Sequence, residues 1–264
     1  MKSNMKLFAA VVVAGVLSSF AARSQNPPAC NIVFMGDSIT AGANLSDPAT
    51  EAPPVQCAQS LAERFNVAVH LSNQGHGGHT TLDWLPSAPS GDFPQALAAA
   101  KTLESDHPGQ LVFSIMLGTN DSFKGPVSPA DYRRNLRNII DQILNNYPNA
   151  FVFIHDPIWF APCAPDHVLA LAQLQTYFPE IDRLVAECAT VHPGRVFAGD
   201  KLAFSHFSKR YLTELTPELR ANGITYYVHP NRAGAAVLGK YWADAIATAL
   251  KFAAREVSQP APAR

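Results

Sequence analysis

The chain reads IVFMGDSIT from Ile32 to Thr40, and this stretch decides the fold class. A short apolar run that is interrupted by a glycine is typical of a buried strand ending in a tight turn. Ser38 is therefore expected at the carboxyl end of a strand, where open α/β sheets bind their ligands. A serine there could act as a nucleophile. It could also cap a helix or close a turn, and Gly-Asp-Ser alone favours that structural role.

Similar apolar runs recur along the chain, and helical stretches lie between them. Runs without polar alternation predict strands that are buried on both faces, and strand–helix alternation predicts right-handed parallel βαβ units. The expected fold is α/β, a three-layer α/β/α sandwich with about five parallel strands. Strands are expected at residues 32–35, 67–71, 111–117, 150–154 and 196–198, and helices at 55–65, 93–103, 129–146, 169–190 and 233–254.

Length and composition indicate a globular chain without an obvious charged partner. The 264 residues suffice for one generous domain or two small ones, and the 47% of hydrophobic residues are ample for a core. With 20 basic and 21 acidic residues, the net charge is −1. That balance argues against nucleic acid or an anionic membrane surface as a partner.

The amino-terminal segment has the layout of a secretory signal peptide. Lys2 and Lys6 precede an apolar stretch from Leu7 to Phe20, and small residues follow. The stretch is short for a membrane-spanning helix, although an uncleaved anchor is the alternative. We predict a signal peptide at residues 1–24, one α/β domain at 25–257 and a Pro-rich disordered tail at 258–264. Export to the periplasm or the exterior follows, without stable membrane insertion after cleavage.

All four cysteines lie after this segment, at positions 30, 57, 163 and 188. An even number in an exported chain predicts disulfides, here two bridges with three possible pairings. Four buried free thiols are the alternative. The sequence does not choose between the pairings.

Three of the expected strands end in polar, glycine-containing segments. These ends are GDS at Gly36–Ser38, NQGHGG at Asn73–Gly78 and GTND at Gly118–Asp121. In a doubly wound sheet, neighbouring carboxyl ends form one crevice. The convergence favours a functional role for Ser38 over a structural one.

A nucleophilic serine needs a base and donors for the developing oxyanion. Among nine histidines, His229 stands out because it is expected in a loop before the last helix, where Pro230 keeps its backbone extended. The backbone N–H of Ser38, the backbone of Gly78 and the side-chain amide of Asn120 are candidate donors. Gly78 and Asn120 also fit structural roles in a turn and between loops.

Together these segments resemble the SGNH hydrolases, also called the GDSL esterase/lipase family. The four blocks that carry the resemblance occur in the family's order and span nearly the whole chain after the signal segment. They are the nucleophile block Gly36–Ser38, the glycine block Asn73–Gly78, the asparagine block Gly118–Asp121 and the histidine block His229–Asn231.

The resemblance implies a flavodoxin-like fold and ester hydrolysis without a cofactor. It assigns Ser38 as the nucleophile and His229 as the base. The Ser38 N–H, the Gly78 N–H and the Asn120 amide would form the oxyanion hole. The substrate class that it implies is a small-molecule or glycan ester.

Tyr226 departs from the family pattern, which usually carries an aspartate three residues before the histidine. A tyrosine offers no anionic partner near neutral pH. A backbone carbonyl could hold the imidazole, another acid could replace the aspartate, or the site could be impaired. We favour a Ser-His dyad or a substituted third member. The candidate acids are Asp200, Glu214 and Glu218.

Five further residues have candidate roles near the site. Asp37 and Asp121 are expected to brace the nucleophile and asparagine loops. His76 and His79 could contact the substrate, and Trp159 could stack on a sugar ring, although a core position for Trp159 is as compatible with the sequence. A metal role for the two histidines is not expected, because no third ligand is apparent near them in the sequence.

The sequence beside Ser38 also bears on which acyl group the substrate carries. A lipid substrate would favour an apolar flap beside Ser38, but residues 41–54 are polar and Pro-rich. We therefore predict removal of O-acetyl groups from a carbohydrate through an acyl-enzyme on Ser38, partly by family analogy. The alternatives are a fatty-acyl esterase, lipase or thioesterase of the same fold, or a glycan-binding protein that lost activity with its aspartate.

Overall fold

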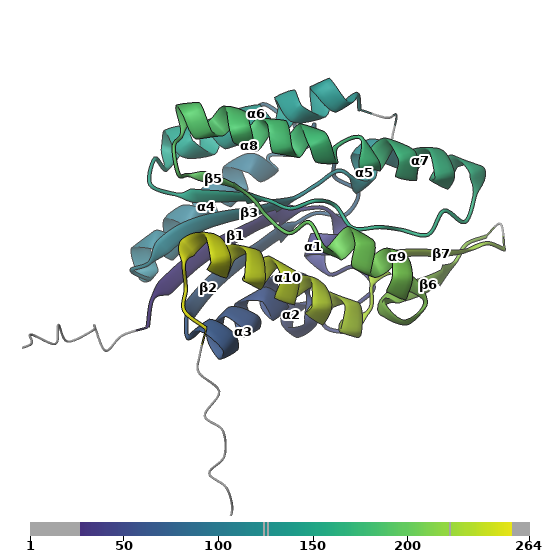
Figure 1. Cartoon of the computed structure of the whole chain (residues 1–264), viewed down its shortest axis with the longest axis horizontal. Coiled ribbons are helices and arrows are strands. Elements are labelled where there is room, and N and C mark those ends of the chain that lie inside the picture. The colour runs from purple at the N-terminus through teal and green to yellow at the C-terminus, as the bar shows by residue number, and fades with distance from the viewer. Residues whose placement is uncertain (1–26, 124, 126, 222, 255–264) are drawn as a thin grey trace, which may run out of the picture.

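Five parallel strands form the central sheet, in the order β2-β1-β3-β4-β5 (Figure 1). The computed structural model describes residues 27–254 apart from 124, 126 and 222. This order is the flavodoxin-like one, so the predicted α/β class and layer architecture are confirmed. The strands are β1 (Ala29–Gly36), β2 (Ala68–Gly75), β3 (Gln110–Met116), β4 (Phe151–Ile154) and β5 (Val196–Ala198).

Helices cover both faces of this sheet (Figure 1). One face carries α4, α6 and α8, and the other carries α3 and α10, which pack closely on each other. The predicted helix at 129–146 coincides with α6, where Ser128 caps the first turn by accepting from the Asp131 N–H. The helices are α1 (Ser38–Ala41), α2 (Pro48–Glu51), α3 (Pro53–Phe65), α4 (Asp92–Asp106), α5 (Thr119–Phe123), α6 (Pro129–Asn146), α7 (Pro165–Gln175), α8 (Phe178–Val191), α9 (Ala203–Glu214) and α10 (Arg232–Leu250).

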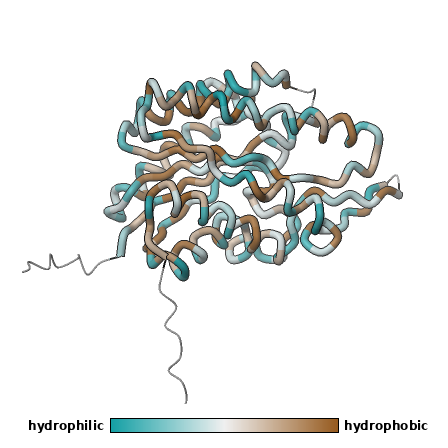
Figure 2. Tube along the Cα trace, viewed as in Figure 1, coloured by the Kyte–Doolittle hydropathy of each residue, from teal (hydrophilic) through white to brown (hydrophobic). Residues whose placement is uncertain are grey.

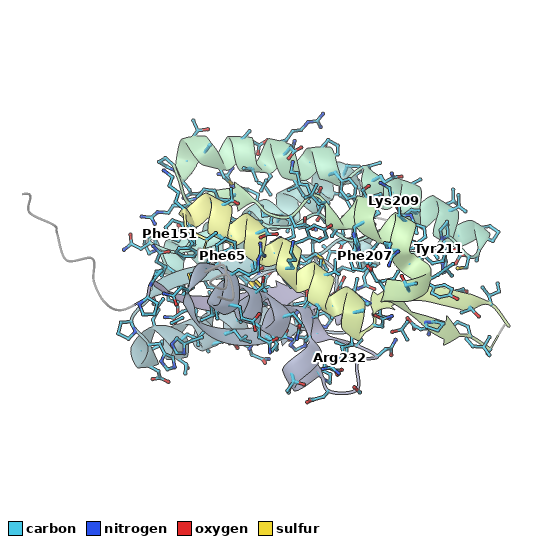
Figure 3. All side chains as sticks on the ribbon, turned by 60° about the horizontal axis from the view of Figure 1, so that its bottom comes forward. Phe65, Phe151, Phe207, Lys209, Tyr211 and Arg232 are labelled. Carbon is cyan, nitrogen blue, oxygen red and sulfur yellow. The ribbon has the colours of Figure 1, made fainter. Side chains whose placement is uncertain are left out.

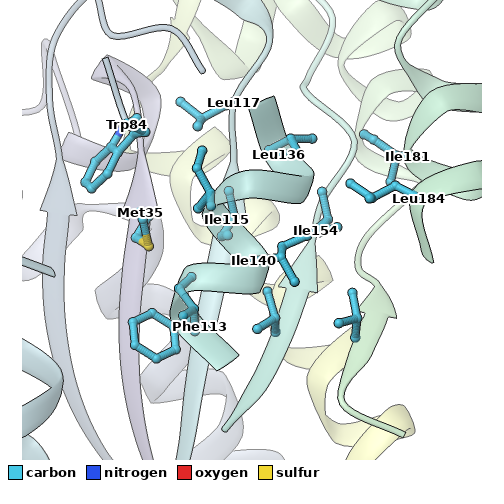
Figure 4. Packing of buried hydrophobic residues seen from close by; sticks show 14 of the residues in the cluster. Met35, Trp84, Phe113, Ile115, Leu117, Leu136, Ile140, Ile154, Ile181 and Leu184 are labelled. Carbon is cyan, nitrogen blue, oxygen red and sulfur yellow. The ribbon is translucent and has the colours of Figure 1, made fainter. Parts of the chain in front are cut away.

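The apolar side chains form two clusters, one on each side of the sheet. Figure 2 shows hydrophobic residues concentrated along the central strands. Figure 4 shows Phe113 and Ile115 of β3 packed against Leu136 and Ile140 of α6. Burial on both faces explains why β1, β3 and β4 lack regular polar alternation, since both of their faces meet helices rather than water. The edge strand β2 is only half-buried along its whole length and carries His70, Ser72 and Gln74 at alternate positions, so the predicted burial on both faces is wrong for this strand.

One predicted helix is wrong in its extent. The expected helix at 169–190 is two helices, because the chain leaves helical hydrogen bonding around Thr176 and Tyr177. Pro179 lies in the first turn of α8, where its missing N–H costs nothing, whereas inside one long helix it would break the ladder.

A two-stranded antiparallel hairpin lies outside the central sheet and was not predicted. It consists of β6 (Leu215–Leu219) and β7 (Thr225–Pro230) and follows α9. His229 therefore lies in a strand, and its predicted position in a loop is wrong. Pro217 and the polar residues of β6 hide this strand from pattern analysis.

The predicted signal peptide and carboxyl-terminal tail lie outside the described residues. Within residues 27–254, leaving aside the three gaps, no helix has the length and apolar character needed to cross a membrane.

The expected disulfides are absent, because all four cysteines are free thiols. Cys30 and Cys57 lie in the cluster under α3 and α10, whereas Cys188 lies in the cluster on the opposite side of the sheet. Cys163 is only partly buried, in the segment before α7. Burial raises the pKa of the Cys188 thiol to about 11, so it resists ionisation.

Replacing Gly239 by alanine should destabilise the protein. A Cβ at this position of α10 would lie 2.6 Å from the backbone nitrogen of Cys57 in α3. Alanine is the better helix former by about 1 kcal/mol, but overpacking two helices costs roughly 1–3 kcal/mol. We expect a lower midpoint in urea unfolding for Gly239→Ala.

Ala236→Ser serves as the control, because Ala236 is an exposed residue of the same helix. It should change the free energy of unfolding by less than about 0.5 kcal/mol. A Gly239→Ala protein as stable as the wild type would show that α3 and α10 do not approach this closely.

Candidate active site

The turn after β1 places Ser38 at the carboxyl edge of the sheet. Gly36 is required there, since a Cβ would lie 2.0 Å from Thr40 Oγ1 and 2.8 Å from the Met116 carbonyl oxygen. Asp37 then caps α1 by accepting a hydrogen bond from the Ile39 N–H at 2.9 Å. The predicted bracing role of Asp37 is compatible with this cap.

Ser38, His229 and Glu218 form one hydrogen-bonded line. Ser38 Oγ lies 2.8 Å from His229 Nε2, and His229 Nδ1 lies 2.6 Å from Glu218 Oε1. A carboxylate only accepts, so Nδ1 carries the proton and Nε2 keeps its lone pair. The Ser38 hydroxyl therefore donates to Nε2, which is the arrangement that nucleophilic catalysis by serine requires.

A β-bulge in the hairpin brings Glu218 and His229 together. Leu215 pairs with Pro230 and Pro217 with Tyr227, so two residue steps on β6 face three on β7. In an unbroken strand His229 would point away from the face that holds Glu218, because successive side chains alternate. The extra residue shifts this alternation and lets the imidazole meet the carboxylate.

Glu218 is held as an anion by its neighbours. Arg220 Nη2 lies 2.8 Å from Glu218 Oε2, and the carboxamide of Asn44 is also bonded to the Glu218 side chain. Burial alone would raise the pKa of Glu218. The hydrogen bond from His229 and its charge, the charge of Arg220 and the hydrogen bond from Asn44 together outweigh this effect of burial. The net result is a lowered pKa for Glu218.

Tyr226 supports this arrangement indirectly. Its ring lies under the Arg220 guanidinium, 5.4 Å from the centroid, and packs against His167 at 4.3 Å. The residue at the usual aspartate position thus helps to place the arginine that binds the substitute acid.

The other two candidate acids have different partners. Asp200 caps α9 by accepting from the Leu202 and Ala203 N–H groups. Glu214 binds His206 and Arg210. Of the three acids named from the sequence, Glu218 alone is bonded to His229.

The glycine and asparagine loops lie against each other. Gly78 has φ 78°, a left-handed conformation that favours glycine. The Asn120 amide donates to the His79 carbonyl at 3.0 Å, which leaves its second N–H for an oxyanion. Asp121 accepts from the Thr81 N–H at 3.0 Å and so ties the two loops together. The predicted bracing role of Asp121 agrees with this geometry.

Burial raises the pKa of both bracing carboxyls, Asp37 and Asp121, to about 6. Hydrogen bonds act in the opposite direction and lower these pKa values, from the Ile39 N–H to Asp37 and from the Thr81 hydroxyl and N–H to Asp121. Both therefore act as acceptors near pH 7, which keeps the nucleophile turn and the asparagine loop in place.

A second serine–histidine pair lies inside the protein, and its hydrogen bond runs in the opposite direction, from the histidine to the serine. Ser114 Oγ is 2.9 Å from His155 Nε2, but His155 Nδ1 accepts from the Asp200 N–H at 2.9 Å. The proton is therefore on Nε2, which donates to the serine. Burial lowers the pKa of His155 to about 3, so this pair cannot activate a nucleophile.

The three candidate substrate residues divide between two places. Trp159 packs on Tyr211 of α9 at 5.0 Å, and Tyr211 contacts Tyr227 of the hairpin at 5.3 Å. Figure 3 shows Tyr211 on α9 near this hairpin. His76 and His79 instead converge on Asp92, a residue that sequence analysis did not single out.

Residues 34–237 match the GDSL-like Lipase/Acylhydrolase family. The chain belongs to this family. The protein is therefore a carboxylic-ester hydrolase, and the resemblance drawn from the four sequence blocks is confirmed. No curated protein sequence matches significantly.

Solved structures show the same fold at low sequence identity. One is a carbohydrate acetylesterase from Sinorhizobium meliloti, at 20% identity and TM-score 0.55, covering 83% of this chain and 98% of that one. Another is a mutant of an acetylxylan esterase from Geobacillus stearothermophilus, at 18% identity and TM-score 0.56, covering 84% and 94%. A third is a family two carbohydrate esterase from Clostridium thermocellum in complex with cellohexaose, at 18% identity and TM-score 0.55, covering 86% and 66%.

Glu218→Gln should lower kcat of this acylhydrolase by about 10²- to 10⁴-fold. The amide keeps the shape of the side chain but removes the anion that fixes the His229 tautomer and stabilises the imidazolium. Steady-state hydrolysis of an activated acetyl ester gives the rate. Glu214→Gln is the matched control and should retain activity within about twofold, because Glu214 binds His206 and Arg210 instead. Equal rates for Glu218→Gln and wild type would exclude Glu218 as the third member.

Arg220→Gln should move the acidic limb of the kcat/KM–pH profile to higher pH. Losing the guanidinium removes positive charge beside the Glu218–His229 pair, so the pair takes up a proton more easily. The Arg220 side chain is half exposed, so we expect a shift of a few tenths of a pH unit. Arg210→Gln, which removes the arginine beside Glu214, should leave the profile in place. A shift to lower pH for Arg220→Gln would contradict the assigned role.

Proposed function

We propose that this acylhydrolase removes O-acetyl groups from a carbohydrate, with Ser38 as nucleophile, His229 as general base and Glu218 as the orienting acid. The hydrogen-bonded line Ser38–His229–Glu218 carries this proposal. An intact line also argues against an impaired glycan-binding protein, since the lost aspartate has a substitute.

The first half-reaction forms an acetyl-enzyme. Ser38 Oγ attacks the ester carbonyl carbon while His229 Nε2 takes the hydroxyl proton. Glu218 stabilises the imidazolium through Nδ1. The tetrahedral intermediate collapses, the carbon–oxygen bond to the sugar breaks, and Nε2 returns the proton to the departing sugar hydroxyl.

The second half-reaction releases acetate. A water molecule gives its proton to Nε2 and attacks the acetyl carbonyl, and Ser38 Oγ leaves with the proton from Nε2. In both halves the oxyanion would accept from the Ser38 N–H, the Gly78 N–H and the second amide hydrogen of Asn120.

The segment after Ser38 supports a small acyl group and a polar alcohol. Its residues 41–54 include no exposed large hydrophobic side chain. Ser46 donates to Glu51 at 2.9 Å, and Glu51 also binds Arg232 at the start of α10. A polar segment fixed in this way suits hydroxyl-rich sugars better than a fatty acyl chain, which needs apolar surface. The acetyl specificity of two similarly folded enzymes points the same way.

Trp159 offers a sugar-stacking surface in this proposal. It is partly exposed and packs beside the hairpin that carries His229. A glycan substrate also fits the proposed export, which rests on the signal-type sequence of residues 1–24.

Ser38→Ala and His229→Ala should each abolish hydrolysis of p-nitrophenyl acetate, with losses of at least about a thousandfold in kcat. Acetate release from acetylated xylan or acetylated cello-oligosaccharides tests the natural class. Wild-type rates no higher than those of the two variants would exclude the esterase mechanism.

Chain length separates the acetylesterase from the lipase alternative. We expect kcat/KM for an octanoyl ester to fall at least about tenfold below that for the acetyl ester, because residues 41–54 include no exposed large hydrophobic side chain to contact the longer chain. An equal or higher rate on the octanoyl ester would favour a fatty-acyl esterase.

A further inference from the structure

His76, His79 and Asp92 converge beside the glycine block, apart from the Ser38–His229–Glu218 line. His79 Nδ1 lies 2.9 Å from one Asp92 oxygen, and His76 Nδ1 lies 3.4 Å from the other. The three ligand-type atoms all lie within 4.8 Å of one another. Across the described part of the chain, no second set of three His, Cys, Asp or Glu residues meets this condition.

Two polar atoms of this cluster are buried without a good hydrogen bond. Asp92 is only 3% exposed. Asp92 Oδ2 and His79 Nδ1 are close, yet neither has a hydrogen-bond partner of acceptable geometry. A buried carboxylate with an oxygen that lacks a hydrogen bond is stabilised by a cation. Three ligand-type atoms within 4.8 Å of one another can meet this need by sharing a metal ion.

The ligands come from separately anchored elements. The His76 N–H donates to the Gly36 carbonyl at 3.1 Å, and buried Trp84 donates to the same oxygen through Nε1. The Trp84 ring lies edge-on to both imidazoles, at 6.0 Å and 6.4 Å. Asp92 is the first residue of α4. Packing that fixes the rings in advance is what metal sites require of their surroundings.

We propose that His76, His79 and Asp92 bind one divalent transition-metal ion of the Zn²⁺ type. Two imidazole nitrogens and one carboxylate form a ligand set that suits Zn²⁺ and Co²⁺. Three protein ligands leave a position for water or a substrate oxygen, and the His76 and His79 side chains are 37% and 22% exposed, so an ion can enter. The ion would join the loop of Gly78 to α4 and so hold the oxyanion donors in place.

Metal binding to the full chain, freed of metal with a chelator, tests the site. Titration with Zn²⁺ by calorimetry should give one ion per chain, and Co²⁺ should produce visible absorption bands of four- or five-coordination. Zn²⁺ at a hundredfold excess over Kd should raise Tm by roughly 5–10 °C. Asp92→Asn and His76→Gln should each weaken Zn²⁺ binding by at least about tenfold. Replacing a residue that only supports a metal ligand already lowers the affinity by about that much.

Two controls isolate the cluster. His107→Gln changes a second histidine pair, in which the His70 and His107 rings stack at 3.5 Å, and should bind Zn²⁺ as the wild type does. His229→Ala should also keep its affinity, which separates this site from the catalytic line. Asp92 is buried and its replacement could impair folding, but His76 is partly exposed, so His76→Gln gives an independent answer.

Saturable binding that is lost in the cluster variants alone would establish the site. No binding by the wild type, or equal affinity in the wild type and His76→Gln, would overturn it and leave a histidine–carboxylate ion pair. Ser38→Ala should bind Zn²⁺ normally whether or not the esterase proposal holds, so the two proposals can fail separately.

Discussion

Strand β1 is paired with a parallel strand on each side, β2 and β3, from Cys30 to Gly36. Helices cover both of its faces, so every backbone and side-chain group before Gly36 is committed to the core. Its one buried polar side chain before the end is Asn31, whose amide donates to the His107 carbonyl, and the reactive polar groups follow only where the strand ends. Parallel pairing then places the ends of β1, β2 and β3 at the same edge, and the nucleophile, glycine and asparagine loops meet there.

The base reaches this edge by a different route. His229 belongs to a hairpin outside the sheet, and Asn231 begins α10 by accepting from the Gly234 N–H. Packing of α10 against α3 therefore fixes the position of the hairpin relative to the Ser38 turn. The orienting acid comes from the same hairpin, so His229 and Glu218 are placed as one unit. The catalytic line therefore joins the end of the central sheet to a hairpin outside it.

The five strands, the nucleophile and the base could be predicted from the sequence because each of them depends on a local pattern. Continuous apolar runs predicted the five strands, and the breaks at Gly36 and Gly118 located their functional ends. Ser38 and His229 followed from the chemistry that a hydrolase needs, and the structure places them in hydrogen-bond contact. The family assignment rests on the same segments.

The features that could not be predicted depend on contacts between distant residues. Glu218 lies on a short strand that contains Pro217, and its contact with His229 depends on a bulge that no single-strand pattern reveals. Asp92 lies 13 residues after His79 and meets it because the segment between them brings the start of α4 back to the loop. The break between α7 and α8 is different, because Pro179 in the first turn of α8 is a local signal that the sequence prediction overlooked.

The bulge in β7 has a consequence for how such sites can diverge. What the imidazole requires is a carboxylate within reach of Nδ1, and this is a condition on position in space. A hairpin that carries an extra residue beside the histidine makes the opposite strand as good a source of that carboxylate as the histidine's own strand. The acid can then migrate from one strand to the other, leaving an aromatic residue in its former place, while the geometry presented to the serine stays the same.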